Sequence, residues 1–405
     1  MTTTQRAPKT DLERLKHPSG RIDLAVLVLW IGTLALVVFG VVMVLSSSTV
    51  TSYLANQGFL GGGMRQALYA IAGVPLMWFA ATRSTAFWRK WAPALFFFGI
   101  FLQLLVFTPL GVEVYGNRNW LSLFGVMQIQ PSEPLKLALI VMIGAAVSMK
   151  ERRLGAVKEE FFPVVVPWGL MALGVVMGGQ DLGTGMVMAA TLIGCMYFAD
   201  LHWKTIWITI GLGLVGVAYF VLSSPNRLHR IFSHSSGVED YSGSDWQPLH
   251  GIWALAGGGM FGVGPGNSKA KWSWLPAADN DYIFAIIGEE LGFIGAAAVI
   301  VVYVVLALAM LQVIRSARDR FGRAVVGGVL VWIVGQALVN IFVVLRILPV
   351  LGVPLPLISA GGTALISCML AMGVVISIAK DASDFHGELA QQPGGKEPHG
   401  AEGTA

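Results

Sequence analysis

Five short polar clusters interrupt an otherwise apolar chain, and they hold residue types that transfer protons or bind anions. In one of them, Asp281 lies where a long polar stretch meets a long apolar run. An ionisable group at the edge of a membrane is costly and usually functional. Partial loss of water raises the pKa of a carboxyl group and suits it to accept a proton. The alternative is that Asp279 or Asp281 caps the following helix.

The apolar run after Asp281 contains a second acidic position. Glu289 lies about 80° around a helix from Asp281 and about two turns deeper, whereas Glu290 faces the opposite side. We therefore take Glu289 as a candidate substrate contact, and the alternative is a buried structural pair of glutamates. Gln247, beside Trp246 in the preceding polar stretch, is a further candidate contact.

A third cluster could bind an anion. Glu133 and Lys136 are three residues apart and share a helix face. Pro131 and Pro134 suit the first turn of a helix, where a missing N–H costs little. The free N–H groups of that turn, the positive end of the helix dipole and Lys136 together suit a phosphate. The alternative is a local ion pair at the membrane edge.

Four more charged residues are candidate substrate contacts. Arg227 and Arg230 are three residues apart at the start of the long polar stretch. Arg118 precedes Asn119 and Trp120, and Asp181 stands where another apolar run begins. For the arginines the alternative is pairing with nearby acidic side chains, and for Asp181 it is a helix cap.

The composition sets the class of protein in which these residues work. The chain has 405 residues, of which 55% are hydrophobic and 12% charged, against about 25% charged in a soluble domain. This balance excludes a soluble enzyme, a disordered protein and a nucleic-acid binder, and it indicates a polytopic membrane protein. The two cysteines, Cys195 and Cys368, lie in apolar runs and form no metal-ligand spacing.

We predict an all-α fold with ten transmembrane helices, because the apolar runs are long and continuous rather than alternating. The expected spans are 24–46, 64–82, 91–110, 134–149, 162–178, 183–199, 206–223, 282–313, 324–346 and 357–379. We expect the first span to be an uncleaved anchor. The other expected segments are a cytoplasmic tail at 1–22, a membrane domain at 23–380 with one long extracytoplasmic loop at 224–281 between helices 7 and 8, and a disordered cytoplasmic tail at 381–405.

The distribution of positive charge predicts the orientation. With both termini in the cytoplasm, 19 of the 27 Lys and Arg residues fall on the inner side of these spans. The polar clusters then face outward. Several of the remaining cations lie beside those clusters, and an anionic ligand would explain why they oppose the general rule.

Taken in order, these motifs resemble the SEDS family (shape, elongation, division and sporulation). The resemblance covers residues 24–380. It rests on Gln130-Pro131-Ser132-Glu133 with Lys136, Gln180-Asp181-Leu182-Gly183-Thr184, Asp281-Tyr282-Ile283-Phe284, Gly288-Glu289-Glu290-Leu291-Gly292, and Pro356-Leu357-Ile358-Ser359 with Gly361-Gly362. The stretch from Ala270 to Asp281 is more similar to the division branch, FtsW, than to the elongation branch, RodA. Asn119 stands where the family usually has Arg, and Thr363 where it has Ser, which leaves the roles of Arg118 and Thr363 open.

The resemblance implies a peptidoglycan glycosyltransferase of the bacterial cytoplasmic membrane. Such enzymes polymerise lipid II at the outer face and work with a class B penicillin-binding protein and, in division, with other divisome proteins. The aspartate that aligns with Asp281 is the family's essential acid. We expect Asp281 to act as base in an inverting displacement that releases undecaprenyl pyrophosphate. Lys136, Arg227 and Arg230 are expected to hold the pyrophosphate.

A divalent cation, Mg²⁺ or Mn²⁺, could share the work of holding the pyrophosphate, although the sequence offers no clean ligand set. Two alternatives from other classes stay open. One is a lipid II flippase. Ion-coupled transporters usually have charged residues near the middle of the membrane, and most of the expected spans lack them. The other is a non-catalytic scaffold that recruits the penicillin-binding protein.

Overall fold

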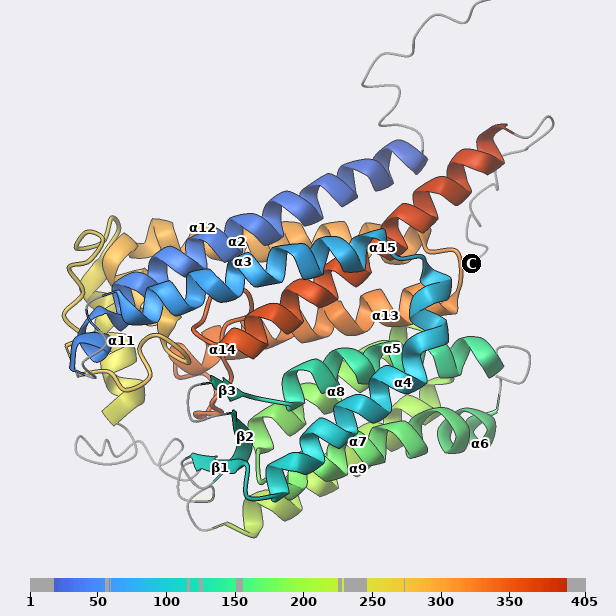
Figure 1. Ribbon diagram of the computed structural model, residues 1–405, viewed down its shortest axis with the longest axis horizontal. Helices are drawn as coiled ribbons and strands as arrows, with labels where there is room; N and C mark the ends of the chain where they lie inside the picture. Colours follow the sequence, from blue (N-terminus) through green and yellow to red (C-terminus); the bar gives the residue numbers. More distant parts are fainter. Residues whose placement is uncertain are drawn as a thin grey trace, which may run out of the picture.

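The computed structural model is a bundle of long helices aligned along one axis, with a small β-sheet at one end (Figure 1). The structure describes residues 18–54, 58, 60–114, 117–123, 127–150, 156–224, 228, 246–272 and 274–391. The helices are α2 (Pro18–Leu54), α3 (Gly61–Thr82), α4 (Thr85–Leu104), η1 (Leu105–Phe107), α5 (Ser132–Lys150), α6 (Val157–Glu160), η3 (Phe161–Val165), α7 (Val166–Gly178), α8 (Leu182–Phe198), α9 (Trp203–Leu222), α11 (Trp246–Gly258), α12 (Ile283–Ser316), α13 (Arg320–Leu330), η4 (Val331–Gly335), α14 (Gln336–Val344) and α15 (Gly362–Gln391).

Eight helices in the described part of the chain are long and apolar enough to cross a membrane. Helix α8 is apolar but shorter, and α3 packs along α2 and α15. Every span expected from the sequence overlaps a helix, so the helical membrane fold is confirmed, while the count of ten crossings stays a prediction. The start of α2 and the end of α15 lie at the same end of the bundle (Figure 1).

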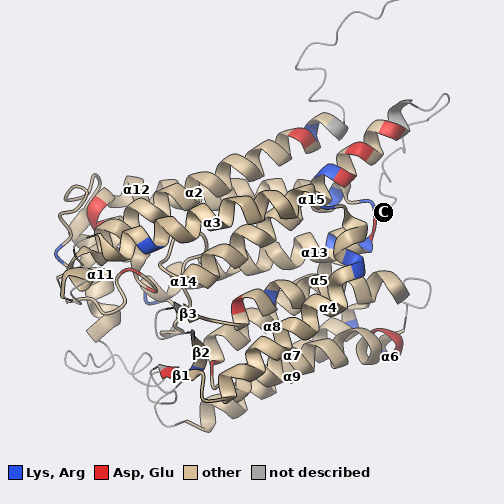
Figure 2. Ribbon diagram, viewed as in Figure 1, with Lys and Arg blue, Asp and Glu red and all other residues tan. Residues whose placement is uncertain are grey.

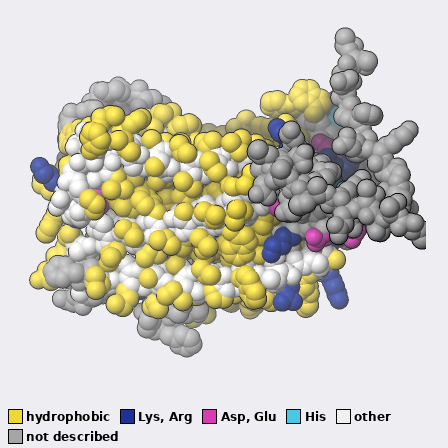
Figure 3. Space-filling view, turned by 90° about the horizontal axis from the view of Figure 1, so that it is seen from above, with side chains coloured by type: hydrophobic (Ala, Val, Ile, Leu, Met, Phe, Trp, Pro, Cys, Tyr) yellow, Lys and Arg dark blue, Asp and Glu magenta, His cyan; other side chains and the backbone are white. Residues whose placement is uncertain are grey.

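Polar side chains fix where several helices begin. Ser84 accepts a hydrogen bond from the backbone N–H of Phe87 at the start of α4, and Asp319 accepts one from Gly322 at the start of α13. Within the helices the backbone groups bond to one another, which hydrocarbon surroundings require. Apolar side chains cover the long side of the molecule that Figure 3 shows, and charged side chains gather toward the ends.

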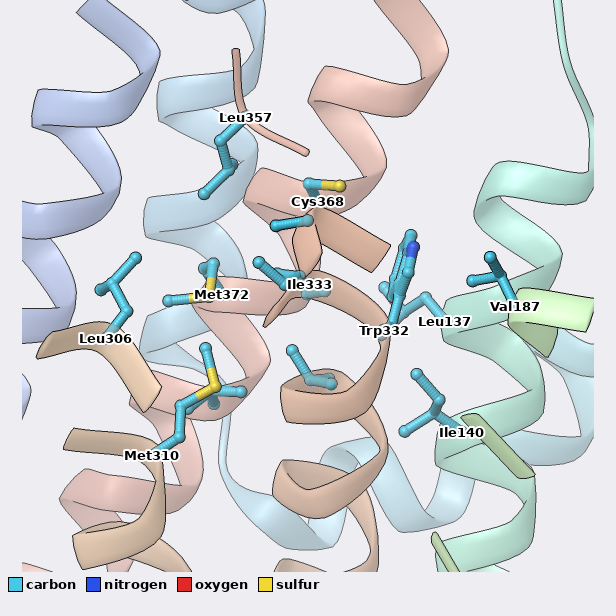
Figure 4. Close-up of a cluster of buried hydrophobic side chains, with 14 of the residues drawn as sticks. Leu137, Ile140, Val187, Leu306, Met310, Trp332, Ile333, Leu357, Cys368 and Met372 are labelled. Carbon is cyan, nitrogen blue, oxygen red and sulfur yellow. The ribbon is translucent and has the colours of Figure 1, made fainter. Parts of the chain in front are cut away.

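The core lies where α5, α13, η4 and α15 meet. Trp332 and Ile333 of η4 pack near Leu137 and Ile140 of α5, and near Met372 of α15 (Figure 4). Their burial fixes the relative positions of the helices that carry the polar clusters. Helix α9 is different, because only a small part of it is covered by the rest of the protein.

The structure adds a sheet that the helical prediction did not contain. Strands β1 (Gly111–Val114), β2 (Asn117–Leu123) and β3 (Met127–Ile129) form an antiparallel sheet in the order β1-β2-β3. Val112 pairs with Trp120, and a bulge follows between Val112 and Glu113. The sheet precedes α5 and lies at the same end of the bundle as α11 (Figure 1).

Two boundaries differ from the expected ones. Helix α15 continues to Gln391, so the first part of the tail predicted as disordered from residue 381 is helical. The loop predicted at 224–281 contains helix α11. Residues 225–227 and 229–245 of that loop lie outside the described residues.

Helix α12 is not continuous. Gly292 has φ 69° and ψ −169°, which separates a half-helix, Ile283–Leu291, from the long remainder. The glycine-rich segment 259–264 replaces the missing helical bonds. Val263 and Gly264 donate their N–H groups to the carbonyls of Glu289 (2.9 Å) and Glu290 (3.0 Å), and Phe293 donates to the carbonyl of Gly259 (2.9 Å). A break in a helix of this apolar character is stable because the protein itself supplies partners for the backbone groups that the break leaves unbonded.

Candidate active site

Asp281 lies two residues before the half-helix of α12, and α12 packs against α11. Figure 2 shows acidic and basic residues at the end of the bundle that carries α11. Its backbone carbonyl accepts a hydrogen bond from Asn340 Nδ2 at 2.8 Å. Its Oδ1 is buried and has no hydrogen-bond partner among the described residues. A carboxylate oxygen left in this state is open to a ligand, because buried polar atoms normally have a partner.

Burial, together with the negative charges of Asp181 and Asp279, raises the pKa of Asp281 to about 7. Burial also raises the pKa of Asp279, while Arg65 opposes that shift. A carboxyl group that titrates near neutral pH exchanges a proton readily at physiological pH. A carboxyl group with this proton affinity is able to act as a general base.

Two groups near Asp281 come from distant parts of the chain. Asp181 caps α8 by accepting from the N–H (3.0 Å) and hydroxyl (2.6 Å) of Thr184. Gly352, with φ 65°, lies against the carboxylate, since a Cβ there would be 3.7 Å from Oδ2 of Asp281. The helix-cap interpretation of Asp181 is thus confirmed. Its charge also acts on Asp281.

The segment from Gly352 to Gly361 holds the chain around Asp279 and Asp281 in place. Ser359 Oγ donates to the carbonyl of Asn280 at 2.7 Å, and the N–H of Ala360 donates to the carbonyl of Asp279 at 2.9 Å. Gln66 of α3 donates to the carbonyl of Ser359 at 3.0 Å. These bonds hold the backbone of Asp279 and Asn280, the two residues just before Asp281, in place.

Glu133 and Lys136 form a buried ion pair in the first turns of α5. Lys136 Nζ lies 2.8 Å from Glu133 Oε1, donates to Gln336 Oε1 at 3.2 Å and lies 4.9 Å from the centre of the Trp332 ring. The side chains of the pair are each 2% exposed. Glu133 Oε2 and Ser132 Oγ have no partner among the described residues, so hydrogen-bonding capacity is left over here.

Gln336 and Asn340 connect this pair to the surroundings of Asp281. Gln336 Nε2 donates to the carbonyl of Pro354 at 2.7 Å. Asn340 Nδ2 donates to the carbonyls of Asp281 and Val353, both at 2.8 Å. The sequence analysis did not select either amide. Their only signal was that they are polar residues within the predicted ninth span, which hydrocarbon disfavours.

Glu289 has a structural role in this conformation. It accepts from the backbone N–H groups of Lys269 (2.9 Å) and Ala270 (3.3 Å) and from the hydroxyl of Ser268. Glu290 accepts from Ser46 Oγ at 2.7 and 2.8 Å and pairs with Lys271 Nζ at 3.2 Å. The alternative interpretation, a buried structural pair of glutamates, describes this arrangement. Glu289 contacts the loop and is not directed at Asp281.

Two further candidates bind the protein backbone. Arg118 donates from Nη2 to the carbonyl of Thr108 and from its N–H to that of Gly179, both at 2.9 Å. Gln247 Nε2 donates to the carbonyl of Pro276 at 2.9 Å. Arg227 and Arg230 lie outside the described residues. The substrate-binding roles of all four stay predictions.

The fold and this site define a class, a polytopic helical membrane protein with a proton-accepting carboxylate at one end of its bundle. A family model described as cell cycle protein, covering FtsW, RodA and SpoVE, matches residues 26–384. The chain belongs to this family, which is the SEDS family.

Two similar proteins support this family membership. The chain is 36% identical to stage V sporulation protein E of Bacillus subtilis over 361 residues, which cover 87% of this chain and 96% of that protein. It is 34% identical to the probable peptidoglycan glycosyltransferase FtsW of Trichlorobacter lovleyi, over 91% of this chain and 96% of that protein.

Two solved structures share the fold. One was determined in a study of polymerisation and crosslinking by a peptidoglycan synthase complex. It has a TM-score of 0.70 and 21% identity, over 87% of this chain and 97% of that one. The other is the rod shape determining protein RodA of Thermus thermophilus, with a TM-score of 0.63 and 23% identity, over 87% and 96%.

Proposed function

We propose that this protein is a peptidoglycan glycosyltransferase that polymerises lipid II at the outer face of the bacterial cytoplasmic membrane, in cell division. The observation that carries the proposal is the buried, unpartnered Oδ1 of Asp281, on a carboxyl group whose pKa is raised to about 7. Relatives that match over most of their length have the names of such enzymes.

In the proposed reaction two lipid II molecules meet at Asp281. The 4-hydroxyl of the acceptor GlcNAc attacks C1 of the donor MurNAc and transfers its proton to the Asp281 carboxylate. The bond from C1 to the phosphate oxygen breaks as the new glycosidic bond forms, and undecaprenyl pyrophosphate leaves. A single displacement inverts an α-linked donor to a β-linked product.

The leaving pyrophosphate requires positive charge. Lys136 is the buried cation that Gln336 and Asn340 connect to Asp281, and we propose it as one pyrophosphate contact. Arg118, Arg227 and Arg230 are the others proposed. Because Glu133 already pairs with Lys136, an arriving pyrophosphate has to share or displace that contact.

A divalent cation, Mg²⁺ or Mn²⁺, is proposed to neutralise part of the pyrophosphate charge when it is bound. The described residues contain no group of three or more His, Cys, Asp or Glu side chains that could hold a metal ion.

For the membrane orientation, we propose that the end with Asp281 faces outward and both termini face the cytoplasm. The excess of Lys and Arg on the opposite side supports this. A class B penicillin-binding protein and other divisome proteins are the proposed partners. One structural neighbour belongs to a study of a peptidoglycan synthase complex.

The test uses the purified full-length chain with its penicillin-binding partner and purified lipid II. Asp281→Asn should insert into the membrane and bind the partner, but lose polymerisation by about 10²–10⁴-fold, because the base is gone. Glycan strands on a gel give the measurement. Polymerisation at the wild-type rate by Asp281→Asn refutes the role of Asp281. Wild-type protein that moves fluorescent lipid II across vesicles but forms no polymer indicates a flippase.

A further inference from the structure

Four aromatic rings gather where the first turns of α11 meet the chain that leads to Asp281. The ring centroids of Trp246 and His250 lie 3.9 Å apart, and Trp274 lies 6.1 Å from the first and 5.9 Å from the second. The ring plane of Trp274 makes an angle of 18° with that of Trp246 and of 19° with that of His250. Trp253 meets His250 edge-on at 4.9 Å. We call these four residues the aromatic platform.

Hydrogen bonds fix the platform in one arrangement. Trp246 Nε1 donates to the carbonyl of Trp274 at 3.0 Å, and His250 Nδ1 lies 2.7 Å from the carbonyl of Trp246. Gln247 ties the same helix turn to Pro276. Trp253 and Trp274 are nevertheless 50% and 55% exposed. Large ring faces are thus held rigid and left open, so a ligand that stacks on them meets little loss of side-chain freedom.

The platform is adjacent to Asp281. Gly251 of α11 packs against the ring of Tyr282, the residue after Asp281, since a Cβ on Gly251 would lie 2.7 Å from two atoms of that ring. Trp246, His250 and Trp253 are within about one and a half helical turns of Gly251. A short chain of sugar rings that begins at Asp281 can therefore reach the platform.

We propose that the aromatic platform binds pyranose rings of a β-1,4-linked N-acetylated glycan through stacking of the sugar C–H faces on the indole rings. This inference rests on the proposed function and adds a glycan subsite beside the reacting position. A hexose presents one apolar face of axial C–H bonds, which matches a flat, electron-rich ring. The half-exposed rings of Trp253 and Trp274 supply the surfaces on which the sugars stack.

A membrane anchor is the competing use of exposed tryptophans, since interfacial indoles place their N–H at the headgroups. Here the N–H of Trp246 is bonded to the backbone of Trp274 instead. The rings also stack on one another rather than lying separately along the flank of a helix, as Trp203 and Trp207 do on α9, where their planes cross at 83°. These two features favour a ligand that stacks.

The experiment measures binding of N-acetylglucosamine tetrasaccharide to the purified full-length chain in detergent by saturation-transfer NMR. Trp274→Ala should bind about fivefold more weakly, the loss expected for one aromatic contact, and Trp274→Phe should recover most of the binding. Trp207→Ala is the matched control, because Trp207 is 56% exposed on α9. It should bind as wild type does.

The outcomes separate this inference from the proposed function. Asp281→Asn should bind the tetrasaccharide like wild type, because binding needs no proton transfer. Wild-type protein that binds the sugar but never polymerises lipid II overturns the proposed function and leaves the platform standing. Equal binding by wild type and a correctly folded Trp274→Ala overturns the platform. So does an equal loss in Trp274→Ala and Trp207→Ala.

Discussion

Among the residues that the structure describes, two acid–lysine pairs are buried, and they differ in which of their polar atoms have no hydrogen-bond partner. In the pair Glu290–Lys271, both carboxylate oxygens accept from Ser46, and Lys271 also donates to the carbonyl of Gly266. In the pair Glu133–Lys136, Glu133 Oε2 has no partner among the described residues. The first pair is saturated and the second retains capacity for a ligand.

The surroundings explain the difference. Glu290–Lys271 joins the half-helix of α12 to the chain that follows the glycine-rich segment 259–264, so its charges hold two parts of the backbone together. Glu133–Lys136 lies within two turns of one helix, where the backbone needs no such link. A buried pair is weak evidence for stability by itself. We therefore expect the first pair to be structural, and the second pair is the one that we propose for substrate binding.

The largest expected effect concerns the unsaturated pair. Lys136→Met leaves Glu133 as a buried carboxylate without its cation, which costs about 3–5 kcal/mol of stability. The double variant Glu133→Gln with Lys136→Met should fold, yet its polymerisation should fall by about 10²-fold or more, because the charge that holds pyrophosphate is lost. Thermal unfolding and the glycan gel measure the two effects. A folded double variant with full activity contradicts the proposal that the pair Glu133–Lys136 binds the pyrophosphate.

The saturated pair should behave in the opposite way. Lys271→Met alone should cost about 3–5 kcal/mol of stability, since Glu290 is then buried and unpaired. The double variant Glu290→Gln with Lys271→Met should recover most of that stability and polymerise at a rate close to wild type. The same two measurements apply. A stable double variant without activity would move this pair from structure to substrate binding.

A smaller effect is expected in the pH dependence of the polymerisation rate. Asp281 acts as a base in its carboxylate form, so the rate should rise with pH up to about 7 and level off above it. Asp181→Asn removes a neighbouring negative charge, which lowers the pKa of Asp281 and should move the midpoint to lower pH while Asn still caps α8. Glu290→Gln is the control and should leave the midpoint unchanged. A midpoint that Asp181→Asn does not move contradicts the electrostatic coupling.

Much of the fold was predictable because hydrocarbon sets strict rules. Long apolar runs must form helices, and every predicted span overlaps one. The break at Gly292 was not predictable from the apolar pattern, which continues through it. The hydrogen bonds with segment 259–264 make that break stable, and this segment lies outside the helix.

The site was predictable in part. Asp281 was selected because a carboxylate at a membrane edge is costly, and the structure leaves its Oδ1 without a partner in the described region. Glu289 was selected by helix geometry, which gives direction but not neighbours, and the loop at Ser268–Ala270 accounts for its oxygens. Gln336 and Asn340 were missed because an amide inside an apolar run does not reveal what it bonds.

The sequence by itself determined the class of protein, the helical spans and the carboxylate that could serve as base, since these follow from the cost of placing polar groups in hydrocarbon. Tertiary structure decided which polar groups are already bonded and which are left open. That division depends on contacts between residues far apart in the chain, as between Ser46 and Glu290 or between Asn340 and Asp281. Local spacing carries no information about such contacts.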